Sequence, residues 1–395
     1  MSSEINSART LPGTVMKEKI NVGIVGGGIG GIATAVALQQ AGIDAVVYER
    51  ASEHREFGAG MMLWPNATRV LRGFGFLDDI LARSGSSTHF RVLTSSGTVL
   101  MDIALGQSDV PAICMRRSDL LNILLSAVQP NCVQLGHKLR TIEQSKDRVR
   151  LSFEGGRVAE HDLVIGADGI RSRVRSELFG SIEPTYRGYS VWRGLAHYQG
   201  KDIQAGANSE TWGAGKRFGI LDVGRGKFTW YATSNEPPGR VTSPGDWKRE
   251  LLNSFHQWHK PITDLIAATD DSEILKNGAY DLAHLRRWTK GRVTLLGDAA
   301  HPCTPNLGQG GGMALEDAAM FAKCITNENT PEAALKRYEH LRRHRTRHIQ
   351  QRSRLIGGIG QWENPIVVAG RRAVTGALPA LFFELRLRRV YSYRI

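Results

Sequence analysis

The chain lacks the cysteine patterns of a metal centre or a disulfide framework. Its 395 residues include only four cysteines, none in a C-x-x-C pair and none beside a histidine cluster: Cys114, Cys132, Cys303 and Cys324. The sequence therefore predicts no metal site and a reduced, cytoplasmic setting.

Long apolar runs are also missing. No stretch reaches the roughly 18 apolar residues that a membrane-spanning helix needs. The longest candidate, residues 373–383, is interrupted by Pro379. Residues 1–17 are polar and lack the apolar centre of a secretory signal, so we expect a flexible N-terminal tail.

Acidic residues are scarce relative to basic ones. The 51 Lys and Arg residues against 38 Asp and Glu residues give a formal net charge of +13. Such a balance suits nucleic acid or an anionic membrane, but no zinc finger, RNA-recognition signature or basic region with heptads is present. We therefore expect no nucleic-acid partner. Residues 373–390 mix Leu and Phe with Arg, which leaves peripheral membrane contact open beside a plain solvated helical surface.

The chain is rich in glycine, with 44 residues, and 41% of its residues are hydrophobic. This composition and the chain length predict a globular α/β protein of two joined domains. Residues 20–25 predict a buried strand, and the segment before Gly42 predicts a helix. Between them, Gly26, Gly28 and Gly31 fit the spacing G-x-G-x-x-G, in which the glycines allow a tight turn, a nearby pyrophosphate and close helix packing.

Glu49 ends the strand that follows this helix. A carboxylate at that position accepts hydrogen bonds from an adenosine ribose. The unit therefore predicts a dinucleotide site, for FAD or NAD rather than NADP.

A second domain is predicted from the aromatic residues. Residues 186–280 carry Tyr, Trp and Phe in alternating segments, which favours an antiparallel sheet. The predicted division is a tail at 1–17, a cofactor domain at 18–185 and 281–340, the sheet domain at 186–280, and helices at 341–395. Residues 90–103 predict a separate hairpin with its turn at 95–97.

Three separated motifs occur together in this chain. They are the glycine turn, the run DLVIGADGIRSR at 162–173, and the run GDAAHPCTPNLGQGGGMALEDA at 297–318. Over residues 21–393 the chain resembles the single-component flavin monooxygenases of the para-hydroxybenzoate hydroxylase type. The resemblance implies a Rossmann-like α/β FAD-binding domain, an inserted antiparallel-sheet substrate domain and a C-terminal helical segment.

The resemblance also implies the reaction. An FAD-dependent monooxygenase uses NADH or NADPH and O2 to insert one oxygen atom into a small aromatic or polyene substrate, through a flavin C4a-hydroperoxide. Hydroxylation or epoxidation, NADH or NADPH, and monomer or dimer all stay open. The alternatives are a non-oxygenating flavoprotein, such as a prenyl-chain reductase or a halogenase, and a membrane-surface binding protein. The halogenase motif W-x-W-x-I-P is absent.

By motif and resemblance together, the FAD site is assigned to backbone-exposing glycines and a few charged residues. Asp298 at a strand end can accept a hydrogen bond from a ribityl hydroxyl, and the glycines from Gly308 onward can stabilise negative charge on reduced flavin. The resemblance places Arg117 at the ribityl or phosphate region, Pro305 near the ring, and Asp168 at both FAD and the nicotinamide. The full prediction is Gly26, Gly28, Ile29, Gly30, Gly31, Glu49, Arg50, Gly60, Arg117, Asp168, Asp298, Pro305, Gly308, Gly310, Gly311 and Gly312.

For the substrate, we expect contacts from Trp192, Arg193, Arg217 and Trp230, between the aromatic sheet and the flavin. The loop at 58–60 is expected to accommodate flavin movement. No side chain is assigned as a catalytic acid or base, since the flavin itself performs the chemistry.

Overall fold

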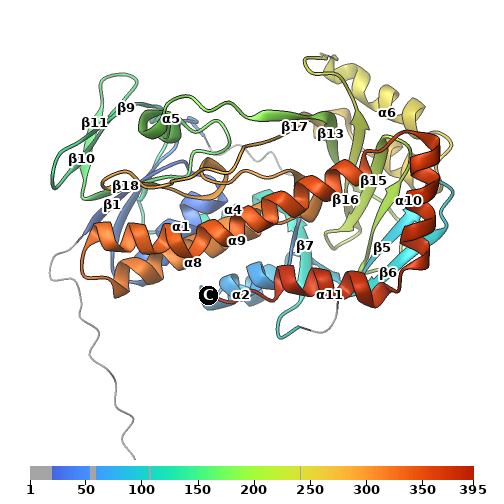
Figure 1. Cartoon of the computed structure of the whole chain (residues 1–395), viewed down its shortest axis with the longest axis horizontal. Helices are drawn as coiled ribbons and strands as arrows, with labels where there is room; N and C mark the ends of the chain where they lie inside the picture. Colours follow the sequence, from blue (N-terminus) through green and yellow to red (C-terminus); the bar gives the residue numbers. More distant parts are fainter. Residues whose placement is uncertain (1–19, 54–58, 106–107, 241) are drawn as a thin grey trace, which may run out of the picture.

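The computed structural model describes residues 20–53, 59–105, 108–240 and 242–395. The predicted tail at 1–17 and Gly58 of the predicted flexible loop lie outside these residues. Figure 1 shows two sheet-based parts, with a long helix lying across both.

The cofactor part is built on a five-stranded parallel sheet in the order β18-β12-β1-β2-β8. Its central strands are buried Val, Ile and Leu runs, as a parallel sheet covered on both faces requires. The strands are β1 (Asn21–Val25), β2 (Asp44–Tyr48), β8 (Val133–Gln134), β12 (Leu163–Gly166) and β18 (Val293–Leu295).

Helices and a small sheet complete this core. The antiparallel strands β9 (Leu139–Gln144), β10 (Val149–Phe153) and β11 (Val158–His161) share the same hydrophobic core as the parallel sheet. Helix α1 packs against both α4 and α8. These helices are α1 (Ile29–Gln40), α4 (Arg117–Ser126), α5 (Arg173–Phe179) and α8 (Gly310–Asn327).

The second part is a seven-stranded sheet in the order β17-β13-β16-β15-β14-β5-β6. It is mostly antiparallel, with β14 parallel to β5. The strands are β5 (His89–Thr94), β6 (Val99–Ala104), β13 (Thr185–His197), β14 (Ala207–Trp212), β15 (Lys216–Asp222), β16 (Lys227–Asn235) and β17 (Leu275–Asp281). The predicted 90–103 hairpin is confirmed as β5–β6, and it joins this sheet although it precedes residue 186.

Two elements close the second part. Helices α6 (Trp247–Phe255) and α7 (Ile262–Ala267) cover one face of the large sheet around a second hydrophobic core. A three-stranded sheet of β3 (Gly60–Leu63), β7 (Ala112–Arg116) and β4 (Gly85–Ser87) contacts β15, and its β3 strand also contacts β16. The first helix after β3 is α2 (Pro65–Gly73), followed by α3 (Leu77–Leu81).

The C-terminal helical segment is confirmed and begins earlier than residue 341. Helix α9 (Pro331–Gly360) is followed by α10 (Pro365–Ala377) and α11 (Ala380–Tyr391). In Figure 1, α9 crosses from the cofactor part to the large sheet, and α10 and α11 lie on the outer margin. Within the described residues no single helix is long and apolar enough to cross a membrane, although α10 and α11 pass that test as a pair bent by 90°.

A buried ionic cluster fastens α9 to α8. Arg342 donates to Asp317 at 2.6 Å and to Glu316 at 2.7 Å, and all three side chains are fully buried. Asn66 at the start of α2 donates to Glu316 at 2.6 Å. Three helices from distant parts of the chain therefore meet at one set of charges.

We predict that Arg342→Met lowers the free energy of unfolding by about 3–5 kcal/mol, because it removes the fully buried cation shared by two buried carboxylates and leaves only Arg345 on Glu316 and His301 on Asp317. The control is Arg343→Met at the next position. That side chain is 44% exposed and its pair with Glu339 lies within one helix, so its loss should cost at most about 1 kcal/mol. Urea unfolding of the apoprotein measures both values, and equal losses would contradict the assignment.

Candidate functional site

The glycine turn between β1 and α1 has the geometry that a pyrophosphate needs. Gly26 has φ +113°, and a Cβ there would lie 2.4 Å from the carbonyl oxygen of Ala167. A Cβ on Gly31 would lie 1.9 Å from the carbonyl oxygen of Gly26. By contrast, a Cβ on Gly28 would meet no atom within 4 Å. Gly26 and Gly31 thus shape the turn, and Gly28 borders open space.

This open space lies at the N-terminus of α1. Gly28 is the N-cap residue, no side chain caps the helix, and its first turn holds no acidic residue. The N–H groups of that turn and the helix dipole are available to an anion. Ile29 is buried, and a Cβ on Gly30 would lie 2.9 Å from Leu296, so these two predicted residues serve packing as well.

Glu49 directly follows β2 and lies beside the turn. Its carboxylate accepts from the backbone N–H of Gly27 at 2.7 Å and from that of Ala51 at 2.9 Å. It therefore holds the turn in shape, and each oxygen keeps a lone pair for a ribose hydroxyl. The neighbouring Arg50 is exposed.

Asp298 follows β18 and is exposed to solvent. The protein atoms packed around its carboxyl nevertheless exclude enough water to raise the pKa of that group. Its carboxylate makes no hydrogen bond or ion pair with any residue that the structure describes. A Cβ on Gly310, the first residue of α8, would lie 4.0 Å from Asp298 Oδ1. The carboxylate is thus free to accept a ribityl hydroxyl.

The glycine run leads into α8 without a side-chain cap. Pro305 is exposed, and Gly308 takes the left-handed conformation with φ +58°. A Cβ on Gly311 would lie 2.4 Å from Met61, and one on Gly312 would lie 3.3 Å from Asn66. These glycines bring the start of α8 close to β3 and α2.

Asp168 has a structural task of its own. Its carboxylate accepts from the hydroxyl of Ser172 at 2.5 Å and from the N–H groups of Arg173 at 2.6 Å and Val174 at 3.0 Å. These bonds hold the start of α5. Its predicted contact with FAD and the nicotinamide stays a prediction.

Arg117 begins α4 and its side chain is exposed. Its positive charge opposes the effect of burial, which raises the pKa of the Asp298 carboxyl, and adds to the effect of burial, which lowers the pKa of Arg193. Gly60 joins the three-stranded sheet to the large sheet, since its N–H donates to the Thr229 hydroxyl of β16 at 2.9 Å.

The two predicted tryptophans do not face this site, and that prediction is corrected. Trp192 and Trp230 are 3% and 1% exposed and pack in the core under α6 and α7. The Trp230 indole donates to Thr269 at 2.8 Å on that side of the sheet. Residues alternate across a strand, so it is Arg193 and Tyr231, directly paired between β13 and β16, that point to the opposite face.

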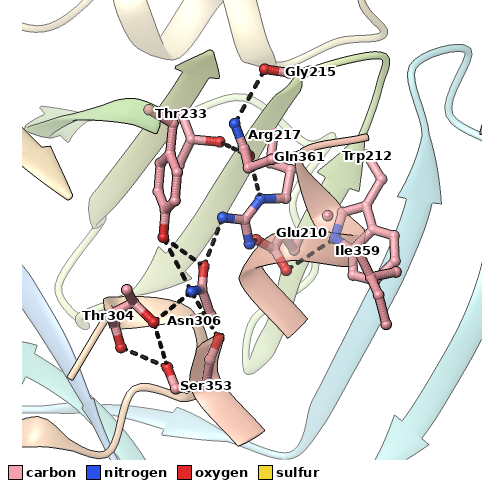
Figure 2. Close-up of polar contacts among 12 residues, drawn as sticks. Glu210, Trp212, Gly215, Arg217, Thr233, Thr304, Asn306, Ser353, Ile359 and Gln361 are labelled. Atoms are coloured by element: carbon pink, nitrogen blue, oxygen red, sulfur yellow. Dashed lines mark hydrogen bonds and ion pairs between the residues drawn. The ribbon is translucent and has the colours of Figure 1, made fainter. Parts of the chain in front are cut away.

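Arg217 points to the same face but is 1% exposed and fully engaged. Its guanidinium donates to Glu210 at 2.9 Å, to Gln361 at 2.8 Å and to Asn306 at 2.6 Å. Figure 2 shows these residues gathered around Arg217. A Cβ on Gly360 would lie 2.8 Å from its side chain. Its prediction as a free substrate contact is corrected: Arg217 braces the end of α9 and positions Asn306, beside Pro305.

Arg193 differs from Arg217 in having no partner in the part of the chain that the structure describes. Its side chain keeps partial exposure and makes no ion pair or hydrogen bond with the described residues. Burial and the charge of Arg117 lower its pKa. Tyr231 beside it is partly exposed, and burial raises the pKa of its phenol. Tyr231 was missed from sequence because the neighbouring Trp230 is the larger aromatic residue.

Residues 19–353 match the FAD binding domain family. The chain belongs to this family. It is 37% identical over 379 residues to the aurachin C monooxygenase/isomerase of Stigmatella aurantiaca, covering 95% of this chain and 98% of that protein.

Two further relatives are informative. The chain is 34% identical over 337 residues to the chloroplastic zeaxanthin epoxidase of Nicotiana plumbaginifolia, covering 79% of this chain and only 50% of that protein. The solved structure of Klebsiella pneumoniae HpxO with FAD and uric acid superposes with a TM-score of 0.89 at 27% identity, covering 94% of this chain and 97% of that one.

These matches confirm the predicted family, the fold class, FAD as the cofactor and an FAD-dependent monooxygenase as the enzyme class. A nicotinamide reductant is typical of this family. The open space at Gly28, the uncapped starts of α1 and α8 and the free carboxylate of Asp298 all fit FAD.

Two alanine substitutions in the glycine turn should separate binding from folding. Gly28→Ala puts a methyl group into open space, so we expect a folded protein whose FAD affinity is lower by about tenfold or more. Gly31→Ala meets backbone at 1.9 Å, so we expect it to fail to fold. Circular dichroism and fluorescence titration with FAD measure the two effects, and wild-type FAD affinity in Gly28→Ala would contradict this placement.

Proposed function

We propose that this enzyme oxygenates an electron-rich aromatic ring that bears an acidic oxygen, using O2 and NADH or NADPH. The single observation that carries the substrate class is Arg193. Its guanidinium has no partner among the described residues and lies on the sheet face turned away from α6 and α7. A charge largely removed from water is costly unless a partner compensates it. A phenolate-like oxygen of the substrate is such a partner, which favours an ionisable aromatic compound over a hydrocarbon polyene.

The roles of the chain's own residues follow from their positions. The N-terminus of α1 binds the pyrophosphate, Glu49 the ribose and Asp298 the ribityl chain. When bound, FAD supplies the redox chemistry and the activation of oxygen. Arg193 holds the substrate oxyanion and favours the ionised form of the substrate. The ionised ring is richer in electrons than the neutral phenol and therefore reacts more readily with an electrophilic oxygen. Tyr231 forms part of the wall beside it. The seven-stranded sheet excludes bulk water from the space between Arg193 and the flavin.

The relatives are consistent with this proposal. HpxO was solved with uric acid, a heterocycle with acidic N–H groups and oxygens, at a TM-score of 0.89 to this chain. The name of the Nicotiana plumbaginifolia protein is that of an epoxidase, so epoxidation of an alkene is the second candidate. A cytoplasmic location stays a prediction.

The reaction is tested with the purified enzyme. Absorption near ~450 nm that anaerobic NADH or NADPH bleaches would support a flavin hydride acceptor. Turnover under ¹⁸O₂ should then place one heavy atom in the product. A product without label, with the reductant consumed and an alkene reduced, would instead support the reductase alternative.

The substrate class is tested at Arg193. We predict that Arg193→Met raises the KM for a turned-over phenolic substrate by about tenfold or more, since a charge-assisted hydrogen bond is lost. Arg193→Lys should recover part of the loss. Bound FAD per protein should stay at the wild-type value in both.

The matched control is Trp192→Phe, one residue away on the opposite face of β13. It should leave KM unchanged. A rise in KM for Trp192→Phe but not for Arg193→Met would overturn the assigned face.

A further inference from the structure

Helix α10 has its polar and apolar sides reversed relative to a helix packed on a protein core. Ile366 is 83% exposed and Val374 is 60% exposed, while Arg371 and Thr375 are 7% and 8% exposed. A surface helix ordinarily turns its apolar stripe inward. Here the apolar stripe faces outward, and it continues through Leu378.

The orientation of α10 is fixed by Arg371. Its guanidinium donates to the carbonyl oxygens of Ile359 at 2.8 Å, Gly360 at 3.0 Å and Gly213 at 2.7 Å. It also lies 5.2 Å from the ring of Trp212. Turning the apolar stripe inward would break all of these contacts, so its exposure is a property of the fold.

Helix α11 continues the apolar surface after a 90° bend. Leu381, Phe382 and Leu385 are 60%, 40% and 50% exposed. Its other side holds the helix in place, since Tyr391 is buried and stacks on Trp64 with ring centroids 5.7 Å apart. Figure 1 shows α10 and α11 meeting in an L on the outer margin of the molecule.

The charges of this segment have one dominant sign. Residues 361–395 contain six arginines, two glutamates and no lysine or aspartate. Both glutamates are engaged, Glu363 by the Asn235 amide and Glu384 by Arg388. Arg372, Arg386 and Arg389 are exposed.

We propose that α10 and α11 dock this enzyme on the surface of an anionic lipid bilayer. Helices of this kind lie in the interface, with apolar side chains in the acyl boundary and arginines on lipid phosphates. At 13 and 12 residues each helix is too short to span a membrane. The apolar stripe supplies the insertion, and the arginines select a negative surface. This inference is independent of the proposed substrate class.

The test uses the FAD-loaded full chain and vesicles of phosphatidylcholine, with or without phosphatidylglycerol. In co-sedimentation, we expect binding to the anionic vesicles that weakens as salt rises. The variant Ile366→Ser/Val374→Ser/Leu381→Ser should reduce that binding by about tenfold or more. The matched control is Leu81→Ser/Val158→Ser, which removes two side chains of 40% and 48% exposure elsewhere.

NADH or NADPH oxidation and the flavin spectrum should be unchanged in both variants, which shows that they are folded. Equal binding of the triple variant and the control would overturn the proposal. So would a wild-type protein that ignores anionic vesicles but sediments as a dimer, with the triple variant a monomer, since the apolar surface would then cover a second copy. Equal affinity for neutral and anionic vesicles would overturn the role of the arginines.

Discussion

The ion pairs of Arg342 with Glu316 and Asp317 determine where α8 begins, and the cofactor site depends on that position. Burial alone would raise the pKa of the Asp317 carboxyl, but the charges of His301 and Arg342 outweigh it and hold the pKa below its ordinary value. Asp317 also accepts from the Gly297 N–H at 2.9 Å, next to Asp298. Arg345 also pairs with Glu316 at 3.1 Å, and His301 pairs with Asp317 at 2.6 Å. Because a buried charge is costly without these partners, one arrangement of β18, α8 and α9 is strongly preferred. His301 belongs to this cluster, which explains its presence without a catalytic role.

The cofactor half of the site could be predicted because its determinants are local. A strand, a glycine turn, a helix and a terminal acid occupy 30 consecutive residues, 20–49, and their geometry follows from backbone sterics. The substrate half could not be predicted in the same way. Both faces of β13 are covered, so its pattern carries no polarity that distinguishes the Trp192 face from the Arg193 face. The large tryptophans were predicted as substrate contacts because of their size. In the structure, their large side chains instead fill the hydrophobic core under α6 and α7.

The role of Arg217 is a second feature that could not be predicted from the sequence. Its partners Glu210, Asn306 and Gln361 lie 7, 89 and 144 residues away, and no spacing rule joins them. The glycines at the end of α9 gave the only hint. Gly357 and Gly360 leave room for Asn306 and Arg217, yet a glycine in a helix by itself predicts only a lower helix propensity. For the same reason β5 and β6 could be predicted as a hairpin but not as members of the large sheet.

Charged side chains that have a protein partner differ in position from those that have none, and the latter lie at the proposed cofactor and substrate sites. Arg342 and Arg217 are buried and bonded to carboxylates. Arg193 is only partly exposed and Asp298 is exposed, and neither makes such a bond within the described chain. A protein that leaves a partly enclosed charge without a partner loses stability that a ligand can restore. FAD at Asp298 and an anionic substrate at Arg193 would each supply the missing partner. Binding of FAD and of the substrate therefore stabilises the folded protein at the same residues that orient the two reactants.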